Sequence, residues 1–230
     1  MKHRAVIFDL FGTLIPTFSY EEYDRVLARM ADLVAASSVE AFREGWYRTG
    51  PERSVGMFRS PAENIRHVCQ ALMFDPDEGA VVQAAGLRLA LTRRALTPRP
   101  GAVATLAFLR GRGLKIGLIS NCSSEVPHLW DTTAFAGLMD EAVFSCAVGL
   151  RKPDPGIYHL ACERLGVRPA ECLYLGDGAS QELSGAQAVG MDPVQLRDPD
   201  ENPADTRREN REDWPGPAIE ALSQILDFVR

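Results

Sequence analysis

The sequence predicts an α/β protein built on a doubly wound parallel sheet, with a second, smaller all-helical domain. Short apolar runs, each followed by polar residues, recur near the amino terminus and again between residues 116 and 178. Such runs are typical of buried parallel strands. Residues 16–96 show helical periodicity instead. A chain of 230 residues can hold one sizeable core and a smaller unit beside it.

The first strand is predicted at residues 5–8, an apolar run that ends at a turn containing Gly12. Asp9 follows this run directly. Ligands of open α/β sheets bind beyond the carboxyl ends of the strands, so Asp9 is expected at a functional position. On its own, this segment would favour an Asp that opens a turn or caps a helix. The later segments of the chain favour the functional interpretation.

The helical segment is predicted to contain four helices, with a loop at residues 49–59 that reaches toward a ligand. The pair Ser60 and Pro61 provides a cap and a first-turn proline for the third helix. In the loop region, Arg53 or Arg43 is expected to hold an anionic group, although a solvated basic loop is the plainer alternative. The expected helices cover roughly residues 20–35, 39–49, 61–73 and 76–95.

Three later segments repeat the pattern of the first strand. Residues 116–121 end in Ser120 and Asn121, residues 149–155 contain Lys152, and residues 172–178 end in the Gly176-Asp177 pair. Each is expected to place a reactive side chain at a strand end or in a connecting loop. A polar loop after a strand is the alternative for Ser120, and a solvated surface charge is the alternative for Lys152.

Two further elements are predicted after these segments. Asp154 and Pro155 fit an N-cap and a first-turn proline, so a helix is expected over residues 156–165. The polar stretch 197–211 is expected to form a surface loop. A final amphipathic helix is then expected after Trp214, with inward-facing residues that include Ile219, Leu222, Ile225, Leu226 and Val229.

The reactive side chains resemble, in type and order, the four motifs of the haloacid dehalogenase-like (HAD) superfamily. These motifs are a nucleophilic Asp, a Ser or Thr, a Lys, and a Gly-Asp pair followed by a second acid. The resemblance covers roughly residues 4–16 and 98–196, and it implies a Rossmann-like core over residues 1–15 and 97–230 with a helical cap domain over residues 16–96. The matching side chains are those of Asp9, Ser120, Lys152, Asp177 and Glu182.

The resemblance also implies a role for each of these residues. Asp9 would be the nucleophile, and Ser120 and Lys152 would hold the transferring group. Asp177 would bind a magnesium ion together with Asp9 and the backbone carbonyl of Phe11, and Glu182 would hold a metal-bound water or cap or brace the following helix. Thr13, which is expected to hydrogen-bond within the turn around Asp9, and Asn121 are the substrate-binding residues expected from the core.

Phe11 departs from the pattern of the phosphatases in this superfamily, which usually carry a proton-donating Asp at that position. A phenyl ring cannot donate a proton, and general acid catalysis typically contributes about 10²- to 10⁴-fold. The dehalogenases of the superfamily also lack that Asp, and they resemble this chain in the spacing of Lys152 and Tyr158. They work without a metal and lack the acidic fourth motif, whereas this chain keeps Asp177 and Glu182.

Three functions therefore remain open. The favoured one is a magnesium-dependent phosphatase of a small metabolite, because Asp9 and Asp177 would repel a phosphate dianion unless Mg²⁺ and Lys152 balanced their charge. The first alternative is a metal-independent 2-haloacid dehalogenase that uses the same Asp9. The second is a non-catalytic protein that binds a phosphorylated ligand.

Composition limits the partners and the compartment. The net charge is −6, with scattered arginines and no basic block, so no nucleic-acid partner is expected. No signal peptide or membrane span is recognised, and the five cysteines show no Cys-x-x-Cys spacing, which favours a cytoplasmic protein with reduced thiols. The expected partner is an anionic small molecule, and the expected assembly is a monomer or a homodimer.

Overall fold

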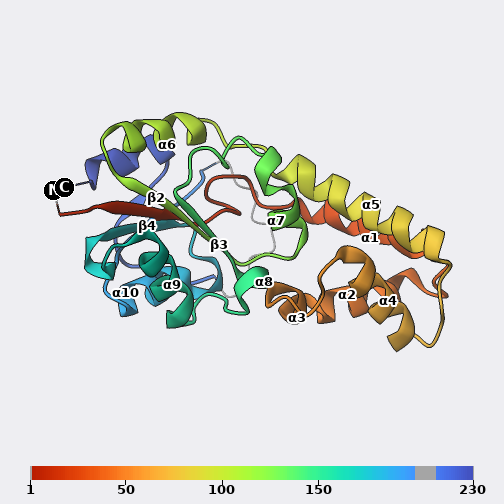
Figure 1. The fold of residues 1–230 in the computed structure, drawn as a ribbon. Coiled ribbons are helices and arrows are strands. Elements are labelled where there is room, and N and C mark those ends of the chain that lie inside the picture. Colours follow the sequence, from red (N-terminus) through yellow and green to blue (C-terminus); the bar gives the residue numbers. More distant parts are fainter. Residues whose placement is uncertain (1, 200–210, 230) are drawn as a thin grey trace.

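A computed structural model describes residues 2–199 and 211–229 of the chain (Figure 1). Its centre is a parallel sheet with the strand order β3-β2-β1-β4-β5-β6. The doubly wound parallel sheet predicted from the sequence is thereby confirmed. The strands are β1 (Ala5–Phe8), β2 (Lys115–Ser120), β3 (Glu141–Phe144), β4 (Cys172–Gly176), β5 (Asp192–Leu196) and β6 (Ala218–Ile219).

Both faces of the sheet are buried, which explains why its strands are apolar runs rather than alternating patterns. Side chains of β1 alternate between the two faces: Val6 and Phe8 pack in one hydrophobic cluster, and Ala5 and Ile7 pack in the other. The first cluster is covered by α6 (Ala102–Gly111) and the 3₁₀ helix η4 (Leu222–Asp227). The second is covered by α9 (Pro155–Leu165) and α10 (Glu182–Ala188).

The strand order reverses beside β1. The chain runs outward from β1 through β2 to β3 and then returns to β4 on the other side of β1. Crossovers that leave such a point in opposite directions open a crevice at the carboxyl ends of the two strands, which is where doubly wound sheets bind ligands. Residues that directly follow β1 and β4 therefore stand at the expected ligand site.

Residues 16–96 contain helices and have a hydrophobic cluster of their own. Serines or aspartates cap several of these helices; Ser60 Oγ, for example, accepts a hydrogen bond from Glu63 N at the start of α4. In Figure 1 the helices of residues 16–96 extend away from the sheet. The cluster includes the fully buried Phe42 and Trp46. The helices are α1 (Tyr20–Leu33), α2 (Val39–Arg48), α3 (Gly50–Ser54), α4 (Pro61–Ala71) and α5 (Glu78–Ala95).

The loop predicted at residues 49–59 is partly helical, since it contains α3. Pro51 stands in the first turn of this helix, where its missing N–H costs nothing. Gly56, which follows α3, packs against the segment after β3: a Cβ added to Gly56 would lie 2.0 Å from the Cys146 carbonyl oxygen in α8 (Ser145–Val148). The end of the loop therefore lies against α8.

Two other predicted elements differ from the structure. Residues 149–155 form no strand, and Lys152 lies in the loop between α8 and α9, which is one of the two kinds of position expected for it. The final amphipathic helix is wrong: Ile219 belongs to β6, and a 3₁₀ helix follows it. The Pro-Gly-Pro sequence after Trp214 leads into an edge strand, whose pairing with β5 outweighs the helical periodicity. The helix predicted at residues 156–165 is confirmed, with Asp154 as its N-cap.

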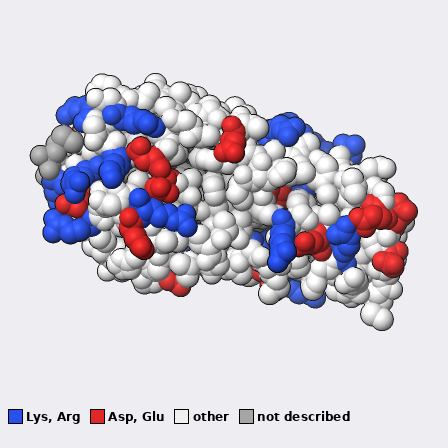
Figure 2. Space-filling view, viewed as in Figure 1, with Lys and Arg blue, Asp and Glu red and all other residues white. Residues whose placement is uncertain are grey.

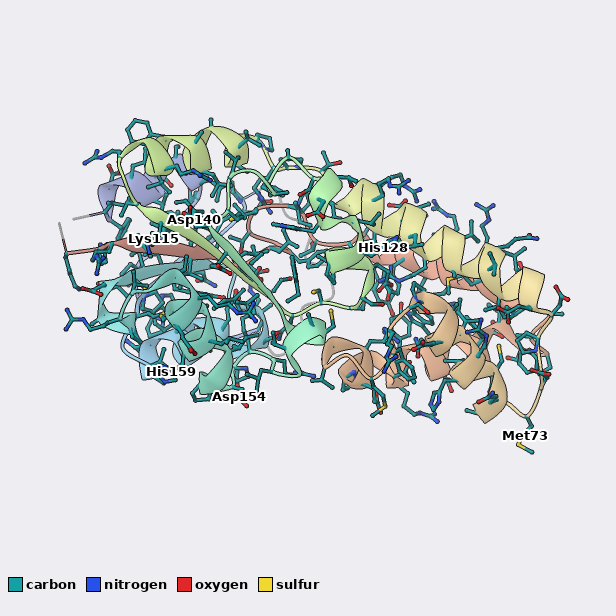
Figure 3. All side chains as sticks on the ribbon, viewed as in Figure 1. Met73, Lys115, His128, Asp140, Asp154 and His159 are labelled. Atoms are coloured by element: carbon teal, nitrogen blue, oxygen red, sulfur yellow. The ribbon has the colours of Figure 1, made fainter. Side chains whose placement is uncertain are left out.

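Acidic and basic side chains are interspersed on the face shown in Figure 2. At the end of the helical segment remote from the sheet, Met73 is almost fully exposed (Figure 3). No helix among the described residues is both long and apolar enough to cross a membrane. The predicted loop at 197–211 lies mostly outside the described residues.

Candidate active site

The three acidic residues predicted for the site come together at the reversal of the strand order. Asp9 follows β1 and Asp177 follows β4, and Asp9 N extends the pairing of these strands by donating to the Leu175 carbonyl at 2.8 Å. Glu182, at the start of α10, completes the group. One carboxylate oxygen from each of the three residues lies within 4.8 Å of the others, and all three residues are buried.

Lys152 lies among these acids. Its Nζ atom is 2.5 Å from Asp9 Oδ1 and 2.5 Å from Glu182 Oε2, and its side chain is buried. It is therefore not a solvated surface charge. One cation among three carboxylates leaves the group with excess negative charge, and buried charges of one sign require further compensation.

The charges of this cluster determine how its groups titrate. Burial and the Glu182 carboxylate raise the pKa of Asp9, the ammonium group of Lys152 lowers it, and the net result is a pKa of about 6. For Lys152, burial alone would lower the pKa, but the carboxylates of Asp9 and Glu182 outweigh it and raise the pKa above its ordinary value. Lys152 is therefore a permanent cation at neutral pH.

Glu182 is held by protein donors on both carboxylate oxygens. Gly178 N donates to Oε1 at 3.0 Å, and the Tyr174 hydroxyl donates to Oε2 at 2.8 Å beside Lys152. The Tyr158 hydroxyl donates to the Glu182 carbonyl at 2.9 Å. This arrangement fits a residue that fixes Lys152 in place better than one that binds a metal directly.

Two glycines permit the close approach of these segments. Gly12 has φ +82°, and a Cβ at this position would lie 2.1 Å from Asp177 Oδ2. A Cβ on Gly176 would lie 2.3 Å from Glu182 Oε1. Any larger residue at either position would push an acidic side chain out of the cluster. The Gly-Thr turn and the Gly-Asp pair therefore have a steric explanation here.

Two buried hydroxyls lie at the ends of the central strands. Ser120 ends β2, and Thr13 lies in the turn after Asp9; both are fully buried. Neither hydroxyl has a hydrogen-bond partner among the described residues, so the bond expected for Thr13 within its turn is not formed by the side chain. Buried hydroxyls are nearly always hydrogen-bonded, which makes both candidates for donation to a bound oxyanion.

Asn121 contacts the backbone of Lys152. Its Oδ1 accepts from Lys152 N at 2.8 Å, and its Nδ2 donates to the Lys152 carbonyl at 3.1 Å. The sequence predicted contact with the substrate, and Asn121 does line the neighbouring pocket. The bidentate contact adds a second task, because it fixes the loop that carries the lysine.

A pocket of about 330 Å³ lies between the sheet end and the helical segment. Phe11, Asn121 and Ser180 line it from the sheet side, and Phe11 and Ser180 follow Asp9 and Asp177 by two and three residues. Asp9 retains 5% of its surface exposed. On the helical side, the lining is rich in aromatic rings, and Phe11 itself stacks on Phe18 with 5.1 Å between ring centroids. Phe11 thus serves as wall and packing residue.

The two arginines predicted to bind an anion differ in their positions. Arg53 lines the pocket and lies over the Trp46 ring, 4.4 Å from its centroid. Arg43 pairs with Asp24 on α1 and is absent from the pocket lining. Their separation in the sequence could not distinguish them, because the direction of each side chain depends on how α2 and α3 pack.

Sequence reasoning missed two residues of this region. Tyr174 lies in a buried strand, and its hydroxyl contacts both Lys152 and Glu182. Arg88 lines the pocket and is 4% exposed. Both carried a recognisable pattern: a tyrosine in a buried strand needs a partner for its hydroxyl, and Arg88 interrupts an otherwise apolar stretch of α5.

The donor set fits a hard divalent cation. Asp9 and Asp177 offer carboxylate oxygens, which are the ligands that magnesium takes, and no sulfur or imidazole ligand belongs to this acidic group. Glu182 stands next to them with its oxygens already engaged. The arrangement can therefore hold a cation and an anion side by side, with a carboxylate available for attack.

Comparison with known proteins identifies relatives of this chain. Residues 3–190 match the family described as haloacid dehalogenase-like hydrolase. The chain is 30% identical over 231 residues to a glyceraldehyde 3-phosphate phosphatase of Methanopyrus kandleri, covering 99% of this chain and 97% of the relative. It is also 30% identical over 201 residues to (S)-2-haloacid dehalogenase 4A of Burkholderia cepacia, covering 84% and 82%. A HAD phosphatase structure from Thermococcus onnurineus superimposes with a TM-score of 0.66 at 24% identity, covering 98% of this chain and 97% of that one.

Proposed function

The chain belongs to the haloacid dehalogenase-like hydrolases, and we propose that it is a magnesium-dependent phosphatase acting on a small phosphorylated metabolite. The observation that supports this proposal most is the convergence of Asp9, Asp177 and Glu182 around Lys152. A carboxylate nucleophile needs no such acidic neighbours to displace a halide. It does need them to hold a cation against a phosphate dianion.

In this proposal Asp9 attacks phosphorus. A bond forms between an Asp9 carboxylate oxygen and phosphorus, and the bond from phosphorus to the ester oxygen breaks with its electron pair leaving on that oxygen. Water then attacks the aspartyl phosphate, which releases inorganic phosphate and regenerates Asp9. Lys152 balances charge, and the hydroxyls of Ser120 and Thr13 donate to the phosphoryl oxygens.

Magnesium would be held by the carboxylates of Asp9 and Asp177 and by the backbone carbonyl of Phe11. When bound, it would neutralise negative charge on the phosphoryl group and so allow a carboxylate to approach it. Glu182 would act indirectly, since its oxygens already accept hydrogen bonds from Lys152, Tyr174 and Gly178. Its task would be to fix the lysine.

We further propose that residues 16–96 form a helical cap domain over a core of residues 1–15 and 97–230. The separate hydrophobic cluster of the helices supports this division, as does a pocket lined from both sides. A cap that covers a pocket excludes water and selects the substrate. Arg53 would contact the substrate from the cap. Arg43 would not, because it pairs with Asp24.

A metal-independent 2-haloacid dehalogenase is the second candidate, and Phe11 favours it. No proton donor is needed when halide leaves, so an aromatic residue at this position is no handicap. Lys152 already contacts Asp9 directly, which would compensate its charge in part. The similarity to a Burkholderia cepacia (S)-2-haloacid dehalogenase also supports this candidate, since that relative and the phosphatase relative are each 30% identical to this chain.

The experiment uses the full chain, dialysed against EDTA and assayed with and without excess magnesium. Acetyl phosphate, glyceraldehyde 3-phosphate and 2-chloropropionate are the substrates, and released phosphate and chloride are measured. The proposal expects phosphate release that depends on magnesium. Chloride release unaffected by EDTA would replace it with the dehalogenase, and no turnover of any substrate would replace it with a binding protein.

Two variants serve as controls for this assay. Asp9→Asn is expected to abolish either activity. Asp154→Asn is its match: Asp154 is an exposed N-cap of α9, and Asn caps helices as well as Asp, so activity should be unchanged. Activity surviving in Asp9→Asn would remove Asp9 from its proposed role.

A further inference from the structure

Two arginines on the helical side of the pocket have guanidinium groups near the same aromatic ring. Arg53 comes from α3 and Arg88 from α5, and both line the pocket. The two guanidinium carbons lie 4.4 Å and 5.9 Å from the centroid of the Trp46 ring. Two cations that face the same ring from different helices form one positively charged wall.

Arg88 has its charge balanced within the protein. Its Nε atom lies 3.0 Å from Glu125 Oε1 on α7 (Glu125–Leu129), and both side chains are almost fully buried. Its guanidinium also lies 4.6 Å from the Tyr23 ring centroid. The ion pair joins α5 to the sheet side of the molecule, where α7 lies beside α5 in Figure 1.

Arg53 differs from Arg88 in its polar partners. Its Nη1 atom donates to the Trp46 carbonyl at 2.5 Å and to Thr49 Oγ1 at 2.7 Å, which are neutral acceptors, and no carboxylate among the described residues forms an ion pair with it. Burial lowers the pKa of Arg53 and the positive charge of Arg88 adds to that effect, whereas Tyr23, Glu125 and Glu52 oppose it; the guanidinium remains protonated. Arg53 is half-buried at the pocket wall, and a guanidinium whose acceptors are all neutral can bind an anion with its remaining N–H donors.

The charge of this wall sets the charge of the group that it would bind. Arg53, Arg88 and Glu125 together carry one net positive charge. The planar fork of a guanidinium matches the two oxygens of a carboxylate. The acidic cluster has excess negative charge and suits a cation with a phosphate, and it lies near the sheet side of the pocket, because the lining residues Phe11 and Ser180 follow Asp9 and Asp177 by two and three positions. The lining also includes the rings of Phe11, Phe18, Tyr20, Tyr23 and Tyr47.

We propose that the substrate carries a carboxylate at the end remote from its reacting group, and that Arg53 binds this carboxylate beside Arg88. This inference rests on the proposed phosphatase function for the reacting end, but the charge of the remote end can be tested separately. The substrate class is thus a phosphorylated carboxylic acid small enough for a pocket of about 330 Å³.

Two matched pairs of compounds test the proposal. The first pair is 3-phosphoglycerate and glyceraldehyde 3-phosphate, which share a skeleton and differ by a carboxylate in place of an aldehyde. The second is 3-phosphonopropionate and propylphosphonate, which cannot be hydrolysed and differ by the carboxylate. With magnesium present, kcat/KM should be about 10- to 100-fold higher for 3-phosphoglycerate, as expected for charged hydrogen bonds. The midpoint of thermal unfolding should rise more with 3-phosphonopropionate.

Arg53→Met should remove both preferences, through a higher KM for 3-phosphoglycerate and little change for glyceraldehyde 3-phosphate. Arg94→Met is the matched control: Arg94 lies on α5 like Arg88, but its side chain is 57% exposed and pairs with Glu22. This control should keep both preferences. The wild-type thermal measurement needs no variant, so it decides the question even if Arg53→Met folds poorly.

The outcomes separate the two proposals. Phosphate release with equal rates for the first pair, or equal thermal shifts for the second, overturns this inference and leaves the phosphatase standing. A preference that Arg53→Met retains also overturns it. If phosphate is released from neither substrate, the phosphatase proposal fails, and a larger thermal shift with 3-phosphonopropionate would still support a carboxylate site at Arg53.

Discussion

The Nζ atom of Lys152 lies 2.5 Å from Oδ1 of Asp9, although the two residues are 143 positions apart in the chain. The lysine reaches Asp9 from a loop that Asn121 holds by two hydrogen bonds, and Glu182 and Tyr174 contact its ammonium group on the other side. The only buried cation of the acidic cluster among the described residues is therefore fixed in position before a substrate arrives. Its removal has consequences for both folding and catalysis.

We expect Lys152→Met to lower activity by about 100- to 1,000-fold, since it removes a preorganised positive charge from the reacting group. The same change leaves the carboxylates of Asp9 and Glu182 buried without their cation. Breaking a buried ion pair on one side typically destabilises a protein by about 3–5 kcal/mol. Steady-state kinetics and urea unfolding measure the two effects. Lys2→Met is the control: its ion pair with Asp192 is exposed, so both quantities should stay near the wild-type values.

Asp9→Asn should stabilise the metal-free protein at neutral pH. The folded protein raises the pKa of Asp9 from 3.8 to about 6, so it binds a proton more tightly than the unfolded chain. Wild-type stability therefore falls as pH rises from about 4 to about 6 and carries the full cost above that range, on the order of 2–3 kcal/mol. The Asn side chain has no such cost.

The gain in Asp9→Asn should thus be absent near pH 4 and complete above pH 6. Thermal unfolding in EDTA measures it, with about 2–4 °C expected for each kcal/mol in a chain of this size. Asp154→Asn, at the exposed cap of α9, should show no pH-dependent gain. Identical behaviour of the two variants would mean that burial does not govern the titration of Asp9.

The parts of the site that the sequence predicted are those that depend on strand ends. Asp9, Ser120 and Asp177 each close an apolar run, and parallel strands bring their carboxyl ends to one edge whatever the loops do. Their positions directly after apolar runs were therefore enough to predict that they lie at the same edge of the sheet. The strands β1, β2 and β4 were recognisable for the same reason, since a sheet covered on both faces needs continuous apolar sequence, whereas β3 and β5 were not predicted.

The parts that were missed depend on packing between segments distant in sequence. Nothing near Arg43 indicates that Asp24 neutralises it, and nothing near Arg53 indicates that it lies on Trp46. The sixth strand was missed because Ile219 fits a helical stripe as well as it fits a strand. Only its pairing with β5 selects the strand, and that pairing is a tertiary interaction.

Asn121→Ala should lower kcat by about tenfold while KM changes little. The variant loses both hydrogen bonds to the Lys152 backbone, each worth about 0.5–1.5 kcal/mol, so the lysine samples positions away from Asp9. A split between kcat and KM identifies a positioning role, whereas a rise in KM alone would identify direct substrate binding. Ser124→Ala is a nearby control, because Ser124 makes no side-chain cap bond at the start of α7. It should leave both constants unchanged.

The identity of residue 11 should determine how strongly the rate depends on the leaving group. With Phe11 on the pocket wall and no proton donor there, acyl phosphates are expected to react faster than alkyl phosphates, because a weakly basic leaving oxygen departs without a proton. A plot of log kcat/KM against leaving-group pKa should therefore slope steeply downward. Equal rates across the series would show that another group supplies the proton.

Phe11→Asp should flatten that slope and raise the turnover of alkyl phosphates. General acids contribute about 10²- to 10⁴-fold where they are well placed, so a gain of about tenfold is expected from an unoptimised carboxyl group. Phe11→Asn is the matched control. Asn has nearly the same size as Asp and loses the same stacking on Phe18, but it cannot donate a proton in this way. If the Asp and Asn variants behave alike, the change reflects the lost ring contact. Faster alkyl phosphate turnover in the Asp variant alone would tie the missing acid to residue 11 and count against the dehalogenase, whose leaving halide needs no proton.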